Sequence, residues 1–557
     1  MFLLGIWTGT LEKTVRVEKL GDFEMIDPAD HSTEKMESQV NTPSPEVIAG
    51  PAVQAQVPVA SIIEAISNLN SSVGTPATQE QTQEMANDQF DADVIVIGAG
   101  PGGYYAAIRA AQHGAKVICV EKEYLGGTCL NWGCVPSKAM IASVEMLHKV
   151  KKADTFGLKK VEGAEMDFDA FIKRKEKIVL TERSGIGMLF KKNKVTHVEG
   201  FAKFIDAHTI SVEKDGKETK LRGKNFILAM GSSVIHIPIP GLSGGRDENV
   251  WTSDDAVTAP FAPKSMVVLG GGAVGCEFSY VFNGLGTDVT LVEMMPTLLN
   301  VMDEDLGKEL GKSLTKQGIK VKTGATIEKV EKTKAGWKAF IKKGTEVEEV
   351  EAEVILLGVG RKANVEGMNL ESIGVKLHRR GVEVVDDTLQ THVSNIWAIG
   401  DVTGRIQLAH VAQQEGLTAV HNIFHPEAKK TVDYRFVPNA VYTSPEVASV
   451  GLTESQAQAA GHDVVVGRSK FMIFAKAMAS NETDGFVKVV ADRKYGEILG
   501  VHMIGGHVTD MITEAVTALV HEATLESMQT VIHAHPTMAE AIIEAFEDAA
   551  GHAIHKM

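Results

Sequence analysis

The stretch DVIVIGAGPGGYYAAIRAAQHGAKVICVEK, residues 93–122, contains three patterns in succession. A short apolar run at residues 93–97 leads directly into GAGPGG, an alanine-rich helical segment follows, and a second apolar run ends at Glu121. Short apolar runs bounded by glycine are typical of buried strands, so this order predicts a βαβ unit. Gly98, Gly100 and Gly103 have the spacing of a dinucleotide-binding loop.

The same order returns at residues 265–293. The strand SMVVL (265–269) precedes GGGAVG, a helix is expected up to Leu285, and the strand DVTLVE ends at Glu293. The glycines of this copy are Gly270, Gly272 and Gly275. In both copies the terminal glutamate lies 23 residues after the first glycine (121 minus 98, and 293 minus 270). A single loop of this kind is a weak signal, but two copies with equal spacing predict two dinucleotide sites.

Each glycine of such a loop has a physical task. The first makes the tight turn, the second lets a pyrophosphate approach backbone N–H groups, and the third lets the helix and strand pack closely. The N-terminus of the following helix attracts the phosphates. The terminal acid, Glu121 or Glu293, is expected to accept a hydrogen bond from a ribose.

A cysteine pair follows the first unit in GGTCLNWGCVPSK, residues 126–138. Cys129 and Cys134 are two of only four cysteines, and they could form half of a zinc site, a structural staple or a redox centre. Zinc sites usually need a second close pair or nearby histidines, whereas Cys119 and Cys276 are single and distant. A chain this long needs no staple, so the redox reading is favoured. Cys119 and Cys276 are expected to be small buried hydrophobic residues.

The cysteine stretch begins five residues after Glu121, so the first dinucleotide would lie beside the sulfurs. A nicotinamide carries electrons as hydride, and a dithiol needs a carrier that connects it to hydride chemistry. A flavin can do this. FAD is therefore expected in the first site and a nicotinamide cofactor in the second.

Composition limits the remaining choices. The chain has 557 residues, 44% hydrophobic content and a net charge of −16, which suggests three or four domains and argues against general nucleic-acid binding. No apolar run reaches the length of a membrane span. The opening MFLLGIW lacks the features of a signal peptide, so a cytoplasmic location is expected. Residues 1–90 read as an extension and linker, and residues 75–88 are polar and of flexible type.

Residues 91–557 resemble the flavoprotein disulfide reductases, and within that superfamily the dihydrolipoyl dehydrogenases. The motifs that carry the resemblance occur in the family's order: GAGPGG, GGTCLNWGCVPSK, GGGAVGCE, GVGRKAN (358–364), AIGDV (398–402), LAHVA (408–412), YTSPEVASVG (442–451) and HAHPTMAE (533–540). The implied fold is α/β, with two doubly wound Rossmann-like dinucleotide-binding domains and a C-terminal α+β dimerisation domain. The implied domain bounds are 91–237 (FAD, first part), 238–360 (NAD), 361–433 (FAD and central part) and 434–557 (interface).

The resemblance implies roles for individual residues. Cys134 would contact the flavin, Cys129 would exchange with substrate, and His535 would be the catalytic base that Glu540 orients. Pro536 would open a helix, with His535 just before it. His533 would be structural.

The cofactor-binding residues follow from the same resemblance. Residues expected at FAD are Gly98, Gly100, Gly103, Glu121, Lys138, Met230, Gly231, Ser232, Asp401, Leu408, Ala409 and His410. Residues expected on the NAD side are Gly270, Gly272, Gly275, Glu277, Glu293 and Gly360, with Glu277 also the ion-pair partner of Lys138. The family usually has threonine where Met230 stands, and a mild effect is expected because the contact there is largely through the backbone.

The implied reaction is the oxidation of dihydrolipoamide to lipoamide with reduction of NAD. The implied partners are lipoyl domains of acyltransferases, or the glycine cleavage carrier protein, and a second copy of the chain. Mercuric reductases need a further cysteine pair at the C-terminus, whereas this chain has no cysteine after Cys276, so that activity is not expected. Glutathione-type reductases use NADP and place arginines where Glu293 stands. A glutamate there would repel the 2′-phosphate of NADP and suits NAD. Residues 1–90 lack the Asp-Lys-Ala tripeptide of a lipoyl domain. Two alternatives stay open: another flavin-dependent disulfide reductase of this fold, and a mainly structural FAD-bearing subunit of a dehydrogenase complex.

Overall fold

The structure is a computed structural model that describes residues 90–556. The expectations for residues 1–89, including the linker at 75–88, lie outside the described residues. The first glycine-rich unit belongs to a sheet in the order β3-β2-β1-β6-β5-β4, with β19 also paired to β6. The strands are β1 (Ala92–Ile97), β2 (Val117–Glu121), β3 (Thr196–Glu199), β4 (Phe201–Asp206), β5 (Thr209–Lys214), β6 (Lys217–Leu228) and β19 (Ile396–Ala398).

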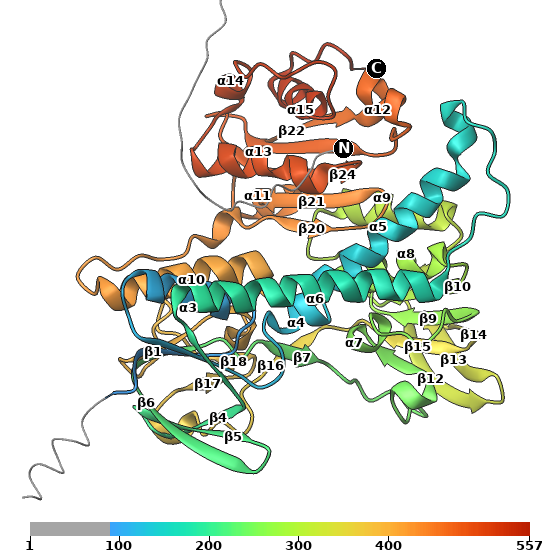
Figure 1. Ribbon diagram of the computed structural model, residues 1–557. Helices are drawn as coiled ribbons and strands as arrows, with labels where there is room; N and C mark the ends of the chain where they lie inside the picture. Colours follow the sequence, from blue (N-terminus) through green and yellow to red (C-terminus); the bar gives the residue numbers. More distant parts are fainter. Residues whose placement is uncertain (1–89, 557) are drawn as a thin grey trace, which may run out of the picture. The chain divides into compact units, whose positions relative to one another are not determined.

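The parallel part of this sheet is β3, β2, β1, β6 and β19, whereas β4 and β5 extend β6 as antiparallel hairpins. The helices of this region are α3 (Pro101–Gln112), α4 (Gly127–Asn131), α5 (Cys134–Lys151), α6 (Phe168–Asn193) and α10 (Ala409–Phe424). Figure 1 shows α3 and α10 lying side by side, although about 300 residues separate them in the sequence. The close approach depends on small residues, since a Cβ on Gly102 would lie 2.7 Å from the Ala412 carbonyl oxygen.

The second unit forms a parallel sheet in the order β11-β10-β9-β15-β8. Its strands are β8 (Val250–Thr252), β9 (Ser265–Leu269), β10 (Asp288–Glu293), β11 (Lys320–Thr323) and β15 (Val354–Leu357). Its helices are α7 (Ser253–Ala256), α8 (Ala273–Gly284) and α9 (Glu304–Lys316). An antiparallel sheet of β12 (Thr326–Thr333), β13 (Gly336–Lys343) and β14 (Glu346–Ala352) adjoins the strands β9, β10 and β15 of the parallel sheet.

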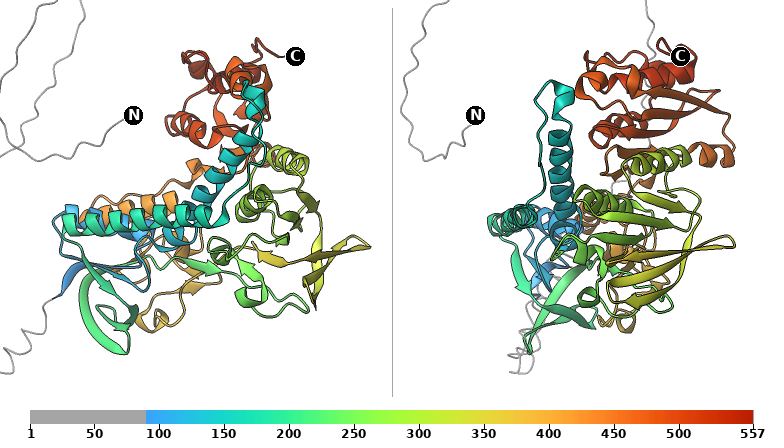
Figure 2. Two further views of the ribbon diagram at one scale, coloured as in Figure 1. Left: turned by 45° about the vertical axis from the view of Figure 1, so that its right-hand side comes forward. Right: turned by 90° about the vertical axis from the view of Figure 1, so that its right-hand side faces the viewer.

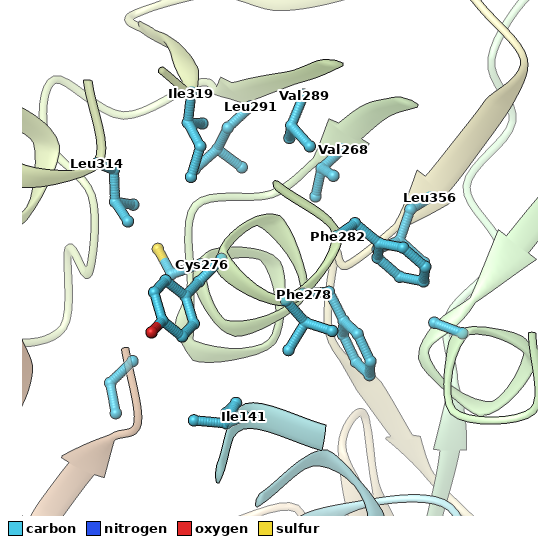
Figure 3. Close-up of a cluster of buried hydrophobic side chains, with 14 of the residues drawn as sticks. Ile141, Val268, Cys276, Phe278, Phe282, Val289, Leu291, Leu314, Ile319 and Leu356 are labelled. Carbon is cyan, nitrogen blue, oxygen red and sulfur yellow. The ribbon is translucent and has the colours of Figure 1, made fainter. Parts of the chain in front are cut away.

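Helix α8 lies at the centre of the largest hydrophobic cluster. Figure 3 shows Phe282 of this helix beside Leu356 of the sheet, Cys276 on another side of the helix, and Phe278 on the side away from the strands, where Ile141 approaches from α5. Cys276 and, in the first unit, Cys119 are fully buried, which confirms the expectation that both are packing residues.

The last domain is an antiparallel sheet in the order β20-β21-β24-β23-β22. Its strands are β20 (Asn439–Val441), β21 (Glu446–Gly451), β22 (Val464–Lys470), β23 (Phe486–Asp492) and β24 (Ile498–Gly505). The helices are α11 (Glu454–Ala459), α12 (Ala475–Ser480), α13 (Val508–Val520), α14 (Leu525–Met528) and α15 (Glu540–Ala550). Side chains of α13, α15 and the sheet share one hydrophobic cluster, so the domain is of the α+β type.

The first and last domains also touch through α5. The C-terminal part of α5 reaches the last domain, where the Lys149 ammonium lies 3.6 Å from the Glu482 carboxylate (Figure 2). The expected fold class is therefore confirmed: two dinucleotide-binding α/β domains precede an α+β domain. Within residues 90–556, no helix combines the length and the apolar content needed to cross a bilayer.

Candidate active site

The outer glycines of both loops stand where no side chain fits. Gly98 has a φ of +101°, and a Cβ there would lie 2.2 Å from the Ala229 carbonyl oxygen. A Cβ on Gly103 would lie 1.9 Å from the Gly98 carbonyl oxygen, because α3 packs directly on its own turn. The second copy repeats this geometry: Gly270 has a φ of +107°, and a Cβ on Gly275 would lie 1.8 Å from the Gly270 carbonyl oxygen.

The middle glycines differ from the outer ones. Gly100 and Gly272 occupy the N-cap positions of α3 and α8, with φ of −65° and −75°. A Cβ on either would have no atom within 4 Å. The fold itself would accept a side chain here, so the open space fits a bound group that approaches the helix N-terminus. Both loops therefore fit a pyrophosphate.

The two terminal glutamates make matching hydrogen bonds. Glu121 accepts from the backbone N–H groups of Ala99 (2.8 Å) and Glu123 (2.9 Å). Glu293 accepts from those of Gly271 (2.5 Å) and Met295 (2.7 Å). A carboxylate has about four acceptor sites, so each can still accept from a ribose hydroxyl. The repeat in sequence is thus a repeat in hydrogen bonding, which fits two dinucleotides.

A cavity of about 1040 Å³ joins the first loop to the cysteines. Fifteen of the predicted site residues line it: Gly98, Gly100, Gly103, Glu121, Cys129, Cys134, Lys138, Met230, Gly231, Ser232, Glu277, Asp401, Leu408, Ala409 and His410. Its volume is at the upper end of the range for cofactor sites, which suits an extended dinucleotide such as FAD. The residues that do not line it are Gly270, Gly272, Gly275, Glu293, Gly360, His535 and Glu540.

Backbone contact ties the cysteine loop to the phosphate loop. The Gly126 N–H donates to the Ala99 carbonyl at 2.8 Å, and a Cβ on Gly127 would lie 2.7 Å from Gly100 Cα. Cys129 lies within α4, and Cys134 is the first residue of α5. The Cys134 side chain is exposed through the cavity that it lines. The sulfurs are therefore held beside the first dinucleotide site.

The two thiols have opposite tendencies to ionise. A hydrogen bond from the Cys129 side chain, followed by the positive charge of Lys138, lowers the pKa of Cys134 to about 7. The same hydrogen bond, together with burial, raises the pKa of Cys129. The start of α5 also favours a negative charge at Cys134. In the reduced pair, these shifts favour the thiolate at Cys134 and the thiol at Cys129.

An ion pair beside Cys134 joins the first two domains, and a hydrogen bond connects it to the last domain. The Lys138 ammonium on α5 lies 2.8 and 2.7 Å from the two carboxylate oxygens of Glu277 on α8. Glu277 also accepts from the Tyr442 N–H at 3.0 Å, and the Lys138 ammonium lies 4.5 Å from the centre of the Tyr442 ring. The Glu277 side chain is buried, so these partners offset the cost of burying its charge.

The turn at Met230–Ser232 is fixed by polar side chains from later in the sequence. The Met230 carbonyl accepts from the Asn364 amide at 3.0 Å, and the Met230 side chain packs against a hydrophobic cluster. The Ser232 hydroxyl donates to Asp401. Burial raises the pKa of Asp401, although that hydrogen bond and the charge of Arg361 oppose the shift.

Sequence reasoning assigned no role to Arg361. Its Nε donates to the Ser232 hydroxyl at 2.8 Å and its Nη2 to the Ser232 carbonyl at 2.7 Å, and it lines the cavity. Arg361 lies in the motif GVGRKAN, directly after Gly360, and this position is the only sign in the sequence that the residue belongs to the site. Gly360 has a φ of +113°, which favours glycine there.

Leu408, Ala409 and His410 mark the start of α10 at the cavity wall. The His410 Nε2 is 3.0 Å from the Pro438 carbonyl oxygen. Burial lowers the pKa of His410, so the ring is neutral near pH 7. A neutral ring whose nitrogen bonds the backbone suits packing rather than proton transfer.

His535 and Glu540 form a pair in the last domain. The His535 Nδ1 is 2.8 Å from a Glu540 carboxylate oxygen, and the His535 side chain is 73% exposed. The pKa of Glu540 is lowered because its hydrogen bonds with His535 and the Thr537 N–H outweigh the effect of burial. The exposed ring leaves Nε2 available to another molecule.

The expected start of this helix was wrong. Helix α15 begins at Glu540, four residues after Pro536, because the preceding residues form turns closed by i→i−3 bonds such as Ala541 N–H to the Met538 carbonyl. The neighbouring His533 is almost buried, with its Nε2 2.8 Å from a Glu514 carboxylate oxygen on α13. A second His–Glu pair therefore anchors the loop that carries His535.

Comparison with known proteins places this architecture in a family. The sequence profile of pyridine nucleotide-disulphide oxidoreductases matches residues 92–416, and the profile of that family's dimerisation domain matches residues 437–546. A dihydrolipoyl dehydrogenase of Mycobacterium leprae is 41% identical over 468 residues, covering 83% of this chain and 99% of the relative. A dihydrolipoyl dehydrogenase of Bacillus subtilis is 42% identical over 478 residues, with the same coverage of both chains.

A solved structure agrees with these sequence matches. The HOCl-induced flavoprotein disulfide reductase RclA of Escherichia coli superposes with a TM-score of 0.73 at 25% identity, over 82% of this chain and 99% of its own. The profiles, the relatives and the paired loops around a cysteine pair agree with one another. The chain belongs to the pyridine nucleotide-disulphide oxidoreductase family.

Proposed function

We propose that this protein oxidises dihydrolipoamide to lipoamide and reduces NAD, using FAD and the Cys129–Cys134 pair. The observation that carries the proposal is the single cavity that Gly100, Cys134 and Lys138 line together. A phosphate loop, a thiolate and a buried ion pair in one cavity suit electron transfer between a dithiol and a dinucleotide. The relatives named dihydrolipoyl dehydrogenase support the substrate.

FAD would lie along this cavity, against the residues that line it, and would supply an electron carrier between the dithiol and a nicotinamide. The chain's own residues then handle the sulfur chemistry. A substrate thiol gives its proton to His535, because only a thiolate attacks a disulfide efficiently. The thiolate attacks Cys129 Sγ in the oxidised pair, the Cys129–Cys134 bond breaks, and Cys134 leaves as a thiolate. The second substrate thiol gives its proton to Cys129 as its sulfur attacks the substrate sulfur bound to Cys129, so the Cys129–substrate bond breaks, lipoamide leaves and Cys129 becomes the thiol.

Two features suit the proton transfer and the leaving group. Glu540 holds His535 by one ring nitrogen, which fixes the tautomer and favours the charged form after proton uptake. The lowered pKa of Cys134 makes it the better leaving group of the pair.

The His–Glu pair lies in the dimerisation domain and does not line the cavity of its own chain. We therefore infer a homodimer in which a second copy of the chain supplies His535.

Glu293 favours NAD over NADP. Its carboxylate accepts two backbone N–H groups at the end of β10, where a 2′-phosphate would meet a negative charge. The proposed protein partners are lipoyl domains of acyltransferases or the glycine cleavage carrier protein.

A substrate comparison tests the proposal. The purified protein is assayed for NADH formation from dihydrolipoamide and NAD, and for NADPH oxidation with low-molecular-weight disulfides. We expect the first reaction to be at least about 100-fold more efficient, given the charge of Glu293 and the dithiol chemistry. Faster NADPH-dependent disulfide reduction would favour another disulfide reductase, and no turnover with either pair would favour a structural subunit.

A further inference from the structure

A buried amide holds the loop that carries Cys129. Asn131 is 7% exposed, and its Nδ2 donates to the Leu125 carbonyl at 3.1 Å and to the Gly127 carbonyl at 2.8 Å. These two bonds close the turn through Gly126, which has a φ of +92°. The amide therefore fixes the backbone directly before Cys129.

A cation from a distant helix fixes that amide in turn. Arg183 of α6 donates to the Asn131 Oδ1 from Nε at 2.9 Å and from Nη2 at 2.6 Å. The Arg183 guanidinium carbon also lies 4.0 Å from the centre of the Tyr124 ring, which contacts Trp132. Helices α4 and α6 lie next to each other in Figure 1. Because both acceptor sites of the amide oxygen are used, Asn131 has no freedom to rotate.

A movement of α4 would displace Cys129 relative to Cys134. Cys129 lies two residues before Asn131, and a Cβ on Gly133 would lie 3.2 Å from Cys129 Cα. Cys134 is held separately, as the first residue of α5. The position of Cys129 relative to Cys134 thus depends on how firmly α4 is anchored.

We propose that Arg183 is a positioning residue that, through Asn131, holds Cys129 in place against Cys134 and so favours their disulfide over the dithiol. The inference rests on the proposed redox role of this pair. Two sulfur atoms that are held close together have a higher effective concentration for one another than two sulfur atoms of which one lies on a loosened loop. Loss of Arg183 should therefore shift the pair towards the dithiol.

The test is the redox equilibrium of the cysteine pair in the full-length, FAD-loaded protein. The protein is equilibrated with mixtures of oxidised and reduced dithiothreitol, the free thiols are alkylated, and the two states are counted by mass spectrometry. We expect Arg183→Met to shift the equilibrium about tenfold towards the dithiol, the size of effect that follows the loss of hydrogen bonds from a charged donor. Arg183→Lys keeps the charge and one donor, so its shift should be intermediate.

Arg174 provides a matched control on the same helix. Its Nη1 donates to the Ala139 carbonyl at 2.9 Å and the Ser143 hydroxyl at 3.2 Å, both on α5 and not on α4. Arg174→Met also removes two hydrogen bonds from α6, but it should leave the redox equilibrium within about twofold of the unsubstituted protein. An Arg183→Met protein with an unshifted equilibrium, or equal shifts in both variants, would overturn the inference.

Asn131→Asp gives a second route if Arg183→Met folds poorly. This variant keeps an acceptor for Arg183 and loses both donations to the turn, so it should shift the equilibrium in the same direction; an unshifted equilibrium would count against the inference. Failure of the proposed function has a different signature, since the unsubstituted protein would then not form NADH from dihydrolipoamide, whatever the equilibrium of its cysteines.

Discussion

Gly272→Ala should separate cofactor binding from folding in the second dinucleotide site. Gly272 has a φ of −75°, which alanine adopts freely, and its Cβ would meet no atom within 4 Å. The free energy of unfolding should therefore stay level or rise by up to about 1 kcal/mol. The methyl group would occupy the space into which the pyrophosphate comes. Each charge-assisted hydrogen bond lost there costs about 1.5–3 kcal/mol, so the Kd for NADH should rise roughly 10- to 100-fold or more.

Two other glycines serve as controls for this experiment. Gly185 lies inside α6 with no atom within 4 Å of its Cβ, so Gly185→Ala should stabilise the protein by up to about 1 kcal/mol and leave NADH binding unchanged. Gly275→Ala places a Cβ 1.8 Å from the Gly270 carbonyl and should destabilise the domain itself. The measurements are thermal unfolding, FAD absorbance and calorimetric titration with NADH. A Gly272→Ala protein that binds NADH as tightly as the unsubstituted protein would refute the assignment of this loop.

Three further predictions concern the sulfur chemistry and the N-terminal extension. His535→Gln should slow dihydrolipoamide oxidation by roughly two or more orders of magnitude and leave flavin reduction by NADH intact, with Glu540→Gln milder; near-normal dithiol turnover in His535→Gln would count against the base. In the reduced protein, the rate of Cys134 alkylation should rise with pH through a midpoint of about 7, because the thiolate forms above the pKa. Lys138→Met removes a charge that lowers this pKa and should move the midpoint upward; an unchanged midpoint would show that Lys138 does not act on Cys134. Deletion of residues 1–85 should leave FAD content and specific activity unchanged, because the family profiles begin at residue 92, and a large loss in the purified truncated protein would reveal a contributing segment.

The sequence predicted the local elements well where one pattern dominates. Strands 265–269 and 288–293 were predicted with the bounds that β9 and β10 have, because buried parallel strands are short, nearly continuous apolar runs. The equal spacing of Glu121 and Glu293 corresponds to equal hydrogen bonding, because the same backbone turn needs the same acceptor.

Contacts between distant segments could not be read in this way. No periodicity in α6 indicates that Arg183 reaches Asn131, and only the fold brings the two together. The expectation that Pro536 opens a helix used a sound local preference, yet the turns closed by i→i−3 bonds delay α15 to Glu540. The anchoring of His533 by Glu514 depends on the packing of α13, which a single sequence does not show.

We propose that Cys134 contacts the flavin and that Cys129 reacts with the substrate, and the absorption spectra of two serine variants test this assignment. Cys129→Ser keeps the Cys134 thiolate beside the flavin, so the FAD-loaded variant should show a long-wavelength thiolate-to-flavin absorbance without added reductant. This absorbance should fade as the pH falls and Cys134 becomes protonated. Cys134→Ser should bind FAD equally well and show no such absorbance at any pH. If Cys134→Ser shows the absorbance and Cys129→Ser shows none, the roles of the two cysteines are the reverse of those proposed.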